Sequence, residues 1–359
     1  MKIAIDARMV NRSGIGNCIK EWLKGVGYAF ALGVEKDIRQ FTESAEVIPF
    51  DCDQIYGYKE QLKFPRLALK RKRPDVLHVP HCNIPMFYRG KMIVTIHDLT
   101  HLVYPEFLPL KPLVHWYFKF IFWFVCKRAD KIMTVSENTK RDLLRFFKVD
   151  EKKIKVITLG VGRQFRKKAA AELERTYEKF GIPKDKKILL YVGNMLAHKN
   201  LNALLEALSV LPEREACRLV LVGKTFAKRA VHSRETELGV GQFCIHAGEV
   251  SDEDLVLLYN IADLFVLPSL YEGFGLPVLE AFACGTPVAC SNTSSLPEVG
   301  GQAAKYFDPK DPRDMARVIG ENLDLKGTCD RLLEEQLAKF SWEKSCEQIR
   351  EVAREVCGK

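Results

Sequence analysis

Residues 269–281 read SLYEGFGLPVLEA, and they mark a junction between a strand and a helix. The apolar run Asp263–Leu267 before them predicts a strand, and a helix with proline in its first turn is predicted over Pro277–Cys284. Gly273 and Gly275 free the backbone to approach a ligand closely. The start of the helix presents unpaired N–H groups and a positive dipole end, an environment that suits a diphosphate.

Strands and helices alternate on both sides of this junction. In the second half, strands are predicted at Lys187–Val192, Arg218–Val222, Cys244–Ala247 and Pro287–Cys290, and a helix at Asn200–Ser209. In the first half, strands are predicted at Ile3–Ala7, Val76–Val79, Met92–Ile96 and Lys131–Val135, and helices at Asn17–Val26, Leu113–Cys126 and Glu137–Phe147. The alternation predicts an α/β protein with two parallel sheets, each covered by helices on both faces.

The length of 359 residues exceeds what one hydrophobic core usually serves, so two domains are expected. We place the first domain at residues 1–165, the second at 166–340 and a final helix at 341–359, with the basic segment Gly162–Ala171 as the linker. Ligands of open α/β sheets bind at the carboxyl ends of the strands. Two such domains facing one another would therefore hold the ligand in a cleft between them.

Two carboxylates flank the predicted diphosphate site. Glu272 lies in the loop and Glu280 on the first turns of the helix, and each could accept hydrogen bonds from vicinal hydroxyls of a sugar or a ribose. Taken singly, Glu272 is better explained as a solvated loop acid, and Glu280 as a charge that favours the helix dipole by about 0.3–1 kcal/mol. The spacing of the two glycines and the proline relative to both acids favours the functional interpretation.

The pattern Glu272-Gly-Phe-Gly-Leu-Pro-x-x-Glu280-Ala resembles the donor-site signature of retaining glycosyltransferase family 4, also called glycosyl transferases group 1, which has the GT-B fold of two Rossmann-like domains. Similar pieces follow in order over nearly the whole chain: Gly14-Ile15-Gly16, Thr95-Ile96-His97-Asp98-Leu99, Thr134-Val135-Ser136-Glu137, Tyr191-Val192-Gly193 with Lys199-Asn200, and Ala283–Val288. Such an ordered series is highly specific. It implies an enzyme that transfers a hexosyl unit from a nucleotide diphosphate sugar to an acceptor.

The resemblance also implies roles for single residues. Glu280 would bind the nucleotide ribose, and Glu272 a hydroxyl of the donor sugar. Main-chain N–H groups that would bind sugar and phosphate belong to Phe274, Gly275 and Leu276, and the base would contact Val250 in the loop Gly248-Glu249-Val250. The last helix would cross back to the first domain.

Negative charge on the departing diphosphate requires a cation, and Lys199, after the strand Lys187–Val192, is the expected one. The family commonly has an Arg directly after the glycine at the end of this strand, whereas this chain has Asn194, which offers hydrogen bonds without charge. His198 is the neighbour that could compensate. Because no Asp-x-Asp signature occurs at a predicted strand end, neither a metal ion nor another cofactor is expected.

In the first domain, the resemblance implies that amides of Gly14 and Gly16 face the donor phosphates, although such a glycine pair often makes only a turn. His97 is expected to orient the donor sugar and to hydrogen-bond the transition state, while Asp98 fixes the local loop. Since both acids of the signature are engaged with hydroxyls, no covalent nucleophile is evident. A front-face reaction is therefore expected, in which the departing phosphate helps to deprotonate the acceptor.

The net charge of +9 could attract nucleic acid, an anionic membrane or phosphorylated small molecules. No nucleic-acid recognition motif accompanies the basic clusters, so nucleic acid is not an expected partner. The aromatic stretch Leu113–Val125, followed by Lys127-Arg128, is interpreted first as a buried helix and second as a surface for shallow membrane contact. Scattered cysteines and an N-terminus without a signal-peptide pattern predict a cytoplasmic protein.

Two other functions stay open. Asn194 suggests a non-catalytic GT-B-like subunit that binds a nucleotide sugar, and a nucleotide-sugar epimerase of the same fold is the other alternative. The sequence does not determine the base, the sugar, the acceptor or the linkage. Because residues 95–100, TIHDLT, followed by Tyr104-Pro105-Glu106, resemble transferases that build bacterial surface polysaccharides, GDP-mannose is the first guess for the donor, and a glycan or lipid-linked glycan for the acceptor.

Overall fold

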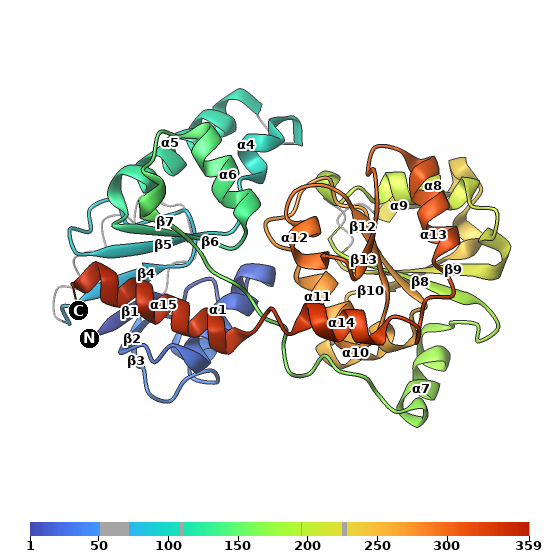
Figure 1. Ribbon diagram of the computed structural model, residues 1–359, viewed down its shortest axis with the longest axis horizontal. Helices are drawn as coiled ribbons and strands as arrows, with labels where there is room; N and C mark the ends of the chain where they lie inside the picture. The colour runs from blue at the N-terminus through green and yellow to red at the C-terminus, as the bar shows by residue number, and fades with distance from the viewer. Residues whose placement is uncertain (51–71, 108–110, 195, 225–227, 359) are drawn as a thin grey trace. The chain divides into compact units, whose positions relative to one another are not determined.

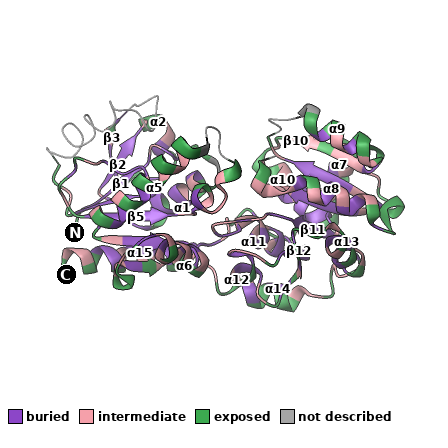
Figure 2. Cartoon of the chain, turned by 90° about the horizontal axis from the view of Figure 1, so that it is seen from above, coloured by how far each residue is buried: buried purple, intermediate pink, exposed green. Residues whose placement is uncertain are grey.

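The computed structural model describes residues 1–50, 72–107, 111–194, 196–224 and 228–358. The chain forms two compact units (Figure 1): Met1–Gly160 together with Ser341–Lys359, and Val161–Phe340. The boundary placed at residue 165 falls in the loop 157–169, which leads into the second unit. The central strands of both units are buried (Figure 2), as expected for two separate α/β cores.

The described strands of the first unit form one seven-stranded sheet in the order β3-β2-β1-β4-β5-β6-β7, and every neighbouring pair is parallel. They are β1 (Ile3–Asp6), β2 (Phe30–Gly33), β3 (Glu46–Pro49), β4 (Val76–Val79), β5 (Met92–Ile96), β6 (Lys131–Thr134) and β7 (Ile154–Val156). Helices α5 (Lys111–Arg128) and α6 (Glu137–Phe146) lie on one face, and α1 (Ser13–Gly25) and α15 (Trp342–Cys357) on the other (Figure 1). Two short helices are α2 (Glu35–Ile38) and α4 (Thr100–Val103).

The last helix, α15, belongs to the first unit although the whole second unit precedes it in sequence. Ser341 caps its first turn. The indole Nε1 of Trp22 in α1 donates to Ser345 Oγ at 3.0 Å in a buried contact. The main-chain N–H of Thr158 donates to Gln348 Oε1 at 2.9 Å. These contacts hold the returning helix on the first sheet.

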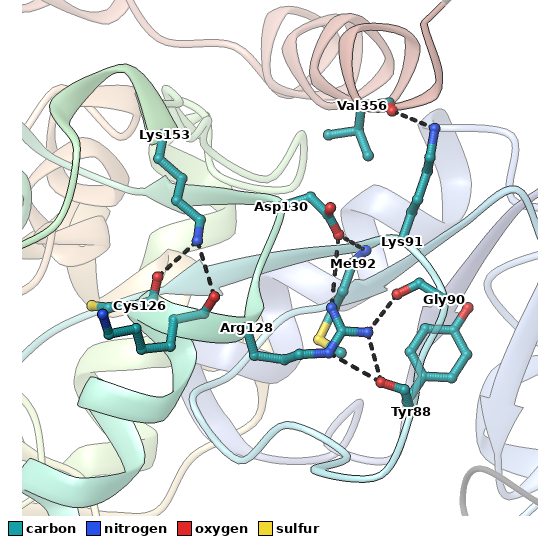
Figure 3. A network of polar contacts seen from close by, with 10 residues as sticks. Tyr88, Gly90, Lys91, Met92, Cys126, Arg128, Asp130, Lys153 and Val356 are labelled. Carbon is teal, nitrogen blue, oxygen red and sulfur yellow. Dashed lines mark hydrogen bonds and ion pairs between the residues drawn. The ribbon is translucent and has the colours of Figure 1, made fainter.

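Basic residues near the end of α5 support the packing of the first unit (Figure 3). Three cations donate to main-chain carbonyl oxygens there: Arg128 to Tyr88 and Gly90, Lys153 to Cys126, and Lys91 to Val356 of α15. This local packing role accounts for Arg128, Lys153 and Lys91 without a nucleic-acid ligand.

Helix α5 is buried along one side only, so the interpretation of this helix as simply buried is wrong. Its inner side includes Ile121, Phe122, Val125 and Cys126, whereas its exposed large apolar residues are Leu113, Trp116, Tyr117, Phe120 and Trp123. The exposed positions recur every three or four residues and therefore share one face of the helix. Among the described residues, none of the helices combines the length and the apolar character that a membrane crossing requires.

In the second unit, six described strands form a parallel sheet in the order β10-β9-β8-β11-β12-β13. The strands are β8 (Lys187–Val192), β9 (Cys217–Val222), β10 (Cys244–Gly248), β11 (Leu264–Leu267), β12 (Val288–Ser291) and β13 (Ala304–Phe307). The helices are α7 (Ala170–Phe180), α8 (Leu201–Val210), α9 (Lys228–Leu238), α10 (Asp252–Ile261), α11 (Leu276–Ala283), α12 (Leu296–Gly300), α13 (Pro312–Glu321) and α14 (Asp330–Leu337). The strand order reverses between β8 and β11, which makes the carboxyl ends of these two strands the expected ligand site.

The prediction of an α/β protein with two parallel sheets is confirmed. One boundary that matters for the site is wrong, because α1 begins at Ser13 and not at Asn17. Gly14 and Gly16 therefore lie in the first turn of the helix and not in a loop before it. Strands β2, β3, β7 and β13 were not predicted: β3, β7 and β13 are short and include a charged residue, whereas β2 is a buried apolar run that was overlooked.

Candidate functional site

The segment 268–275 connects β11 to α11 at the carboxyl edge of the second sheet. Gly275 precedes α11 with φ of 112°, a backbone conformation that residues with a side chain rarely adopt. A Cβ added there would lie 2.8 Å from Cδ2 of the buried Leu296. The proline of the motif, Pro277, lies in the first turn of the helix as predicted. The glycine thus allows a sharp entry into the helix, where the Val278 N–H donates to the Gly275 carbonyl oxygen at 3.0 Å and Pro277 has no N–H.

Glu272 and Lys199 are in direct contact. Lys199 Nζ donates to Glu272 Oε1 at 2.6 Å, and the two side chains are 21% and 12% exposed. Ser269 Oγ donates to the same oxygen at 2.6 Å. Because these residues follow β8 and β11, the pair lies where the strand order reverses. The structure therefore joins the predicted cation and the predicted sugar-binding acid in one cluster.

Two serines that lie outside the predicted motifs fix the loop around Glu272. The N–H of Glu272 donates to Ser294 Oγ at 3.0 Å. Ser295 Oγ contacts the carbonyl oxygens of Glu272 and Phe274 at 2.9 and 2.7 Å. Both serines follow β12, the next strand of the sheet, in the run Asn292–Ser295. A polar run directly after a predicted strand was the available signal.

The loop that carries Lys199 is tied to the same segment. Asn200 has φ of 57° and stands between the 3-10 turn Ala197–Lys199 and α8. Its amide Nδ2 donates to the carbonyl oxygens of Pro268 and Pro309 at 3.0 and 2.7 Å. The N–H of Leu270 donates to the carbonyl oxygen of His198 at 2.8 Å. The position of Lys199 is thus fixed by main-chain and amide contacts, independently of its ion pair.

Asn194 and Val250 follow two other strands of the same sheet. Asn194 comes after β8, where its carbonyl oxygen accepts from Tyr191 OH at 3.5 Å. Val250 follows β10 and is partly exposed. Their predicted contacts with the donor stay predictions, as does the use of the Phe274, Gly275 and Leu276 main chain.

Glu280 has a hydrogen-bond partner that differs from those of Lys199 and Glu272. Tyr259 OH donates to Glu280 Oε2 at 3.0 Å. Desolvation raises the pKa of the Glu280 carboxyl to about 7, with a smaller contribution from the charge of Asp252, while the hydrogen bond from Tyr259 opposes the rise. Near neutral pH this carboxyl therefore exists in both protonation states. Only the ionised state can accept hydrogen bonds on both oxygens without also being a donor.

We expect donor affinity to increase as the pH is raised from 6 to 8, since the ionised fraction of a carboxyl with a pKa near 7 rises about tenfold over that range. The measurement is the Kd of the intact nucleotide sugar, whose diphosphate does not titrate in this range, as a function of pH. Glu280→Gln should bind more weakly and show no such slope. An equal slope in the variant would assign the titration to another group.

The first unit places His97 after β5, where it is largely buried. Its Nε2 lies 3.1 Å from the carbonyl oxygen of Pro80. Burial lowers the pKa of His97 to about 4, against smaller opposing effects of Asp98 and of the Pro80 carbonyl. The ring is therefore neutral at pH 7, with the proton on Nε2 and an acceptor at Nδ1. This form suits the orientation of a hydroxyl, and Asp98 Oδ1 accepts from the Thr100 N–H at 2.9 Å, which fixes the local loop.

Gly16 has a structural reason to be glycine. A Cβ at this position would lie 2.4 Å from the Val10 carbonyl oxygen, and its N–H donates to the Arg12 carbonyl oxygen at 2.7 Å. The N–H of Gly14 lies earlier in the first turn, before intrahelical bonding begins. The N–H of Gly16 is therefore used in the helix, whereas that of Gly14 precedes the intrahelical hydrogen bonds.

A buried ionic cluster beside these residues was not selected from the sequence. Asp6, at the end of β1, is fully buried and accepts from Arg8 at 2.8 and 2.6 Å and from His81 Nε2 at 3.0 Å. His78 contacts Tyr28 OH and Thr95 Oγ1 at 2.7 and 2.8 Å. Strand-end packing thus accounts for His78 and His81.

Comparisons with known proteins agree with this geometry. Residues 173–338 match the sequence model described as Glycosyl transferases group 1, and residues 29–165 match that of Glycosyltransferase Family 4. The O-antigen chain mannosyltransferase B of Escherichia coli is 33% identical over 282 residues, which are 77% of this chain and 73% of that protein. The chain belongs to glycosyltransferase family 4. The family predicted from the motifs is therefore confirmed, and the chain is a glycosyltransferase.

Two further matches define the extent of the likeness. The serotype-specific mannosyltransferase WbdA of Escherichia coli is 31% identical over 275 residues, 74% of this chain but only 33% of that longer protein. The crystal structure of Anabaena HepE in complex with UDP and glucose has a TM-score of 0.78 and 17% sequence identity, and covers 99% of this chain and 100% of its own. At this identity the structural match shows the fold, and the GT-B fold is thereby confirmed.

Proposed function

We propose that this family 4 glycosyltransferase transfers a hexosyl unit, as a first guess mannosyl from GDP-mannose, to a glycan or lipid-linked glycan in surface polysaccharide biosynthesis. The observation that carries the donor site is the contact of Lys199 with Glu272 at the carboxyl ends of β8 and β11, next to the glycine entry into α11. The mannosyl assignment is supported by the likeness to the O-antigen chain mannosyltransferase B.

The proposed reaction retains the anomeric configuration and uses no covalent enzyme intermediate. The acceptor hydroxyl oxygen forms a bond to the anomeric carbon as the bond from that carbon to the phosphate oxygen breaks, and the acceptor proton passes to the departing phosphate. Lys199 stabilises the charge that develops on this phosphate. Glu272 holds a sugar hydroxyl with its carboxylate, and the neutral His97 offers Nδ1 as an acceptor. Neither side chain is required as a nucleophile.

The transfer reaction is tested with GDP-mannose, UDP-glucose, ADP-glucose and dTDP-glucose, each with isolated polysaccharide repeat units and their lipid-linked forms. We expect one donor to yield a glycosylated product whose anomeric configuration by NMR is that of the donor. Isomerised donor without product would indicate an epimerase, and binding without turnover would indicate a non-catalytic subunit. We expect the step to need no divalent ion, so a turnover lost in EDTA and restored by Mg²⁺ would contradict the proposed chemistry.

We further propose that the exposed aromatic stripe of α5 contacts the membrane that carries a lipid-linked acceptor. Trp116 and Trp123 are 65% and 47% exposed, and Lys119 lies over the Trp116 ring at 5.1 Å. Exposed tryptophans beside cations suit the interface of an anionic bilayer.

We expect the protein to sediment with anionic vesicles more than with neutral ones, and expect replacement of Trp116 and Trp123 by Ser to reduce this fraction. Phe87→Ser is the matched control, since Phe87 is 63% exposed elsewhere in the first unit. If neither vesicle type retains the wild-type protein, or if both variants sediment equally, the stripe does not bind membranes.

A further inference from the structure

Three side chains of the second unit that the donor site does not use are close together. His232 and Glu235 lie three residues apart on α9 and share one face of the helix, and His246 lies on β10. His232 Nδ1 is 3.0 Å from Glu235 Oε2, and His246 Nε2 is 2.8 Å from Glu235 Oε1. One nitrogen or oxygen from each residue lies within 4.8 Å of the other two. The two imidazole centroids are 4.7 Å apart.

The carboxylate at the centre of this cluster is buried. Glu235 is only 3% exposed, and a buried carboxylate is unfavourable unless a cation or sufficient hydrogen bonds compensate it. The neighbouring Arg234 is directed elsewhere, to Glu206 and Glu237. Within the described ranges, the ion-pairing groups at Glu235 are thus the two imidazoles, which carry a charge only when protonated.

The contact of His246 with Glu235 is close but poorly directed for a hydrogen bond. Glu235 Oε1 forms no hydrogen bond of good geometry with His246 Nε2, although the two atoms are only 2.8 Å apart, and the other neighbour at this carboxylate is the Cys244 thiol, a weak donor. A buried carboxylate oxygen and an imidazole nitrogen that lie close together without a hydrogen bond are both available as metal ligands. A cation bound there would compensate the buried charge and use the lone pairs of all three residues.

We propose that His232, Glu235 and His246 bind one Zn²⁺ ion or a similar borderline divalent cation. Two imidazoles and one carboxylate form a known type of three-ligand zinc set, with bonds of about 2.0–2.2 Å. Tetrahedral bonds of about 2.0 Å place ligand atoms roughly 3.3 Å apart, so atoms that now lie within 4.8 Å of one another would have to approach by up to roughly 1.5 Å. Mg²⁺ prefers oxygen ligands and water and is not expected to bind.

The cation would stabilise the edge of the sheet of the second unit. β10 is the terminal strand and pairs only with β9 in the described sheet. A metal bridge would connect β10 to α9, two residues before Gly248 and the loop that contains Val250. This is a structural role, and it places no metal at Lys199 or Glu272. The proposal therefore does not depend on the proposed transfer reaction.

The test uses the full-length chain without a histidine tag, stripped with a chelator. Zn²⁺ affinity is measured by competition with a chromophoric chelator, and the visible absorption of added Co²⁺ reports tetrahedral nitrogen and oxygen ligation. We expect one Zn²⁺ per chain, a rise in Tm with Zn²⁺ and none with Mg²⁺. In His232→Gln and His246→Gln the Kd should increase at least about 100-fold, since even the loss of a residue behind a ligand costs 10–100-fold.

His101→Gln is the matched control, because His101 is an exposed histidine of the first unit. It should retain wild-type Zn²⁺ affinity and the same Tm shift. The side chain of His232 is 61% exposed, so His232→Gln keeps the test valid if His246→Gln folds poorly. Wild-type protein that binds no Zn²⁺, or His232→Gln that binds it as tightly as wild type, would overturn the proposal. Donor binding measured on the same samples separates this outcome from a failure of the transferase assignment.

Discussion

Lys199→Met is expected to lower kcat about 10²–10³-fold, the usual cost of removing one group that stabilises developing negative charge. Among the described residues, the ammonium of Lys199 is the cation that forms an ion pair with Glu272, at 2.6 Å. Methionine keeps the length of the side chain and removes its charge. The loop should persist, because Asn200 and the main chain of His198 hold it. Steady-state kinetics of donor turnover provide the measurement.

Lys187→Met is the matched control for this experiment. Lys187 begins the same strand, β8, and its Nζ pairs with Asp324 at 2.7 Å, at the end of the strand opposite to the site. Its replacement should leave kcat near the wild-type value. If both variants lost activity equally, or if Lys199→Met kept full kcat, Lys199 would not stabilise the departing phosphate.

Gly275→Ala is expected to raise the KM for the donor at least about tenfold, equivalent to about 1.4 kcal/mol. The methyl group would have to occupy a position with φ of 112° and only 2.8 Å from Leu296 Cδ2. Strain of this kind costs about 1–3 kcal/mol, and relief requires movement of the main chain that leads into α11. Donor KM and Tm of the same preparations are the two measurements.

The control for backbone strain alone is Gly181→Ala. Gly181 follows α7 with φ of 63°, and a Cβ there would meet no atom within 4 Å. Both variants should lose stability, whereas only Gly275→Ala should lose donor affinity. An unchanged KM in Gly275→Ala would show that the entry into α11 does not position the donor.

Much of the fold could be predicted because its buried parallel strands are apolar runs with clear ends. The strands Lys187–Val192, Val76–Val79 and Met92–Ile96 have the predicted bounds. Short strands such as Ile154–Val156 could not be predicted in the same way, since three residues carry no periodicity. The start of α1 was misplaced because glycines suggested a loop, whereas Gly16 is needed there for close packing against Val10.

The candidate site could be predicted only where a motif joins residues that are near in sequence. Glu272, Gly275 and Pro277 are of this kind. The contact of Lys199 with Glu272 depends on the pairing of β8 with β11, which sequence alone does not provide. The two serines after β12 and the raised pKa of Glu280 likewise arise from tertiary packing.

The central claim is that Glu272, Glu280 and the glycine entry into α11 bind a nucleotide diphosphate sugar. Calorimetric titration of wild type and of the double variant Glu272→Gln and Glu280→Gln with GDP-mannose, and in parallel with UDP-, ADP- and dTDP-sugars, tests it most directly. Each lost charged hydrogen bond costs about 1.5–3 kcal/mol, so the double variant should bind the preferred donor at least about 100-fold more weakly. A double variant that folds and binds this donor as tightly as wild type would contradict the claim.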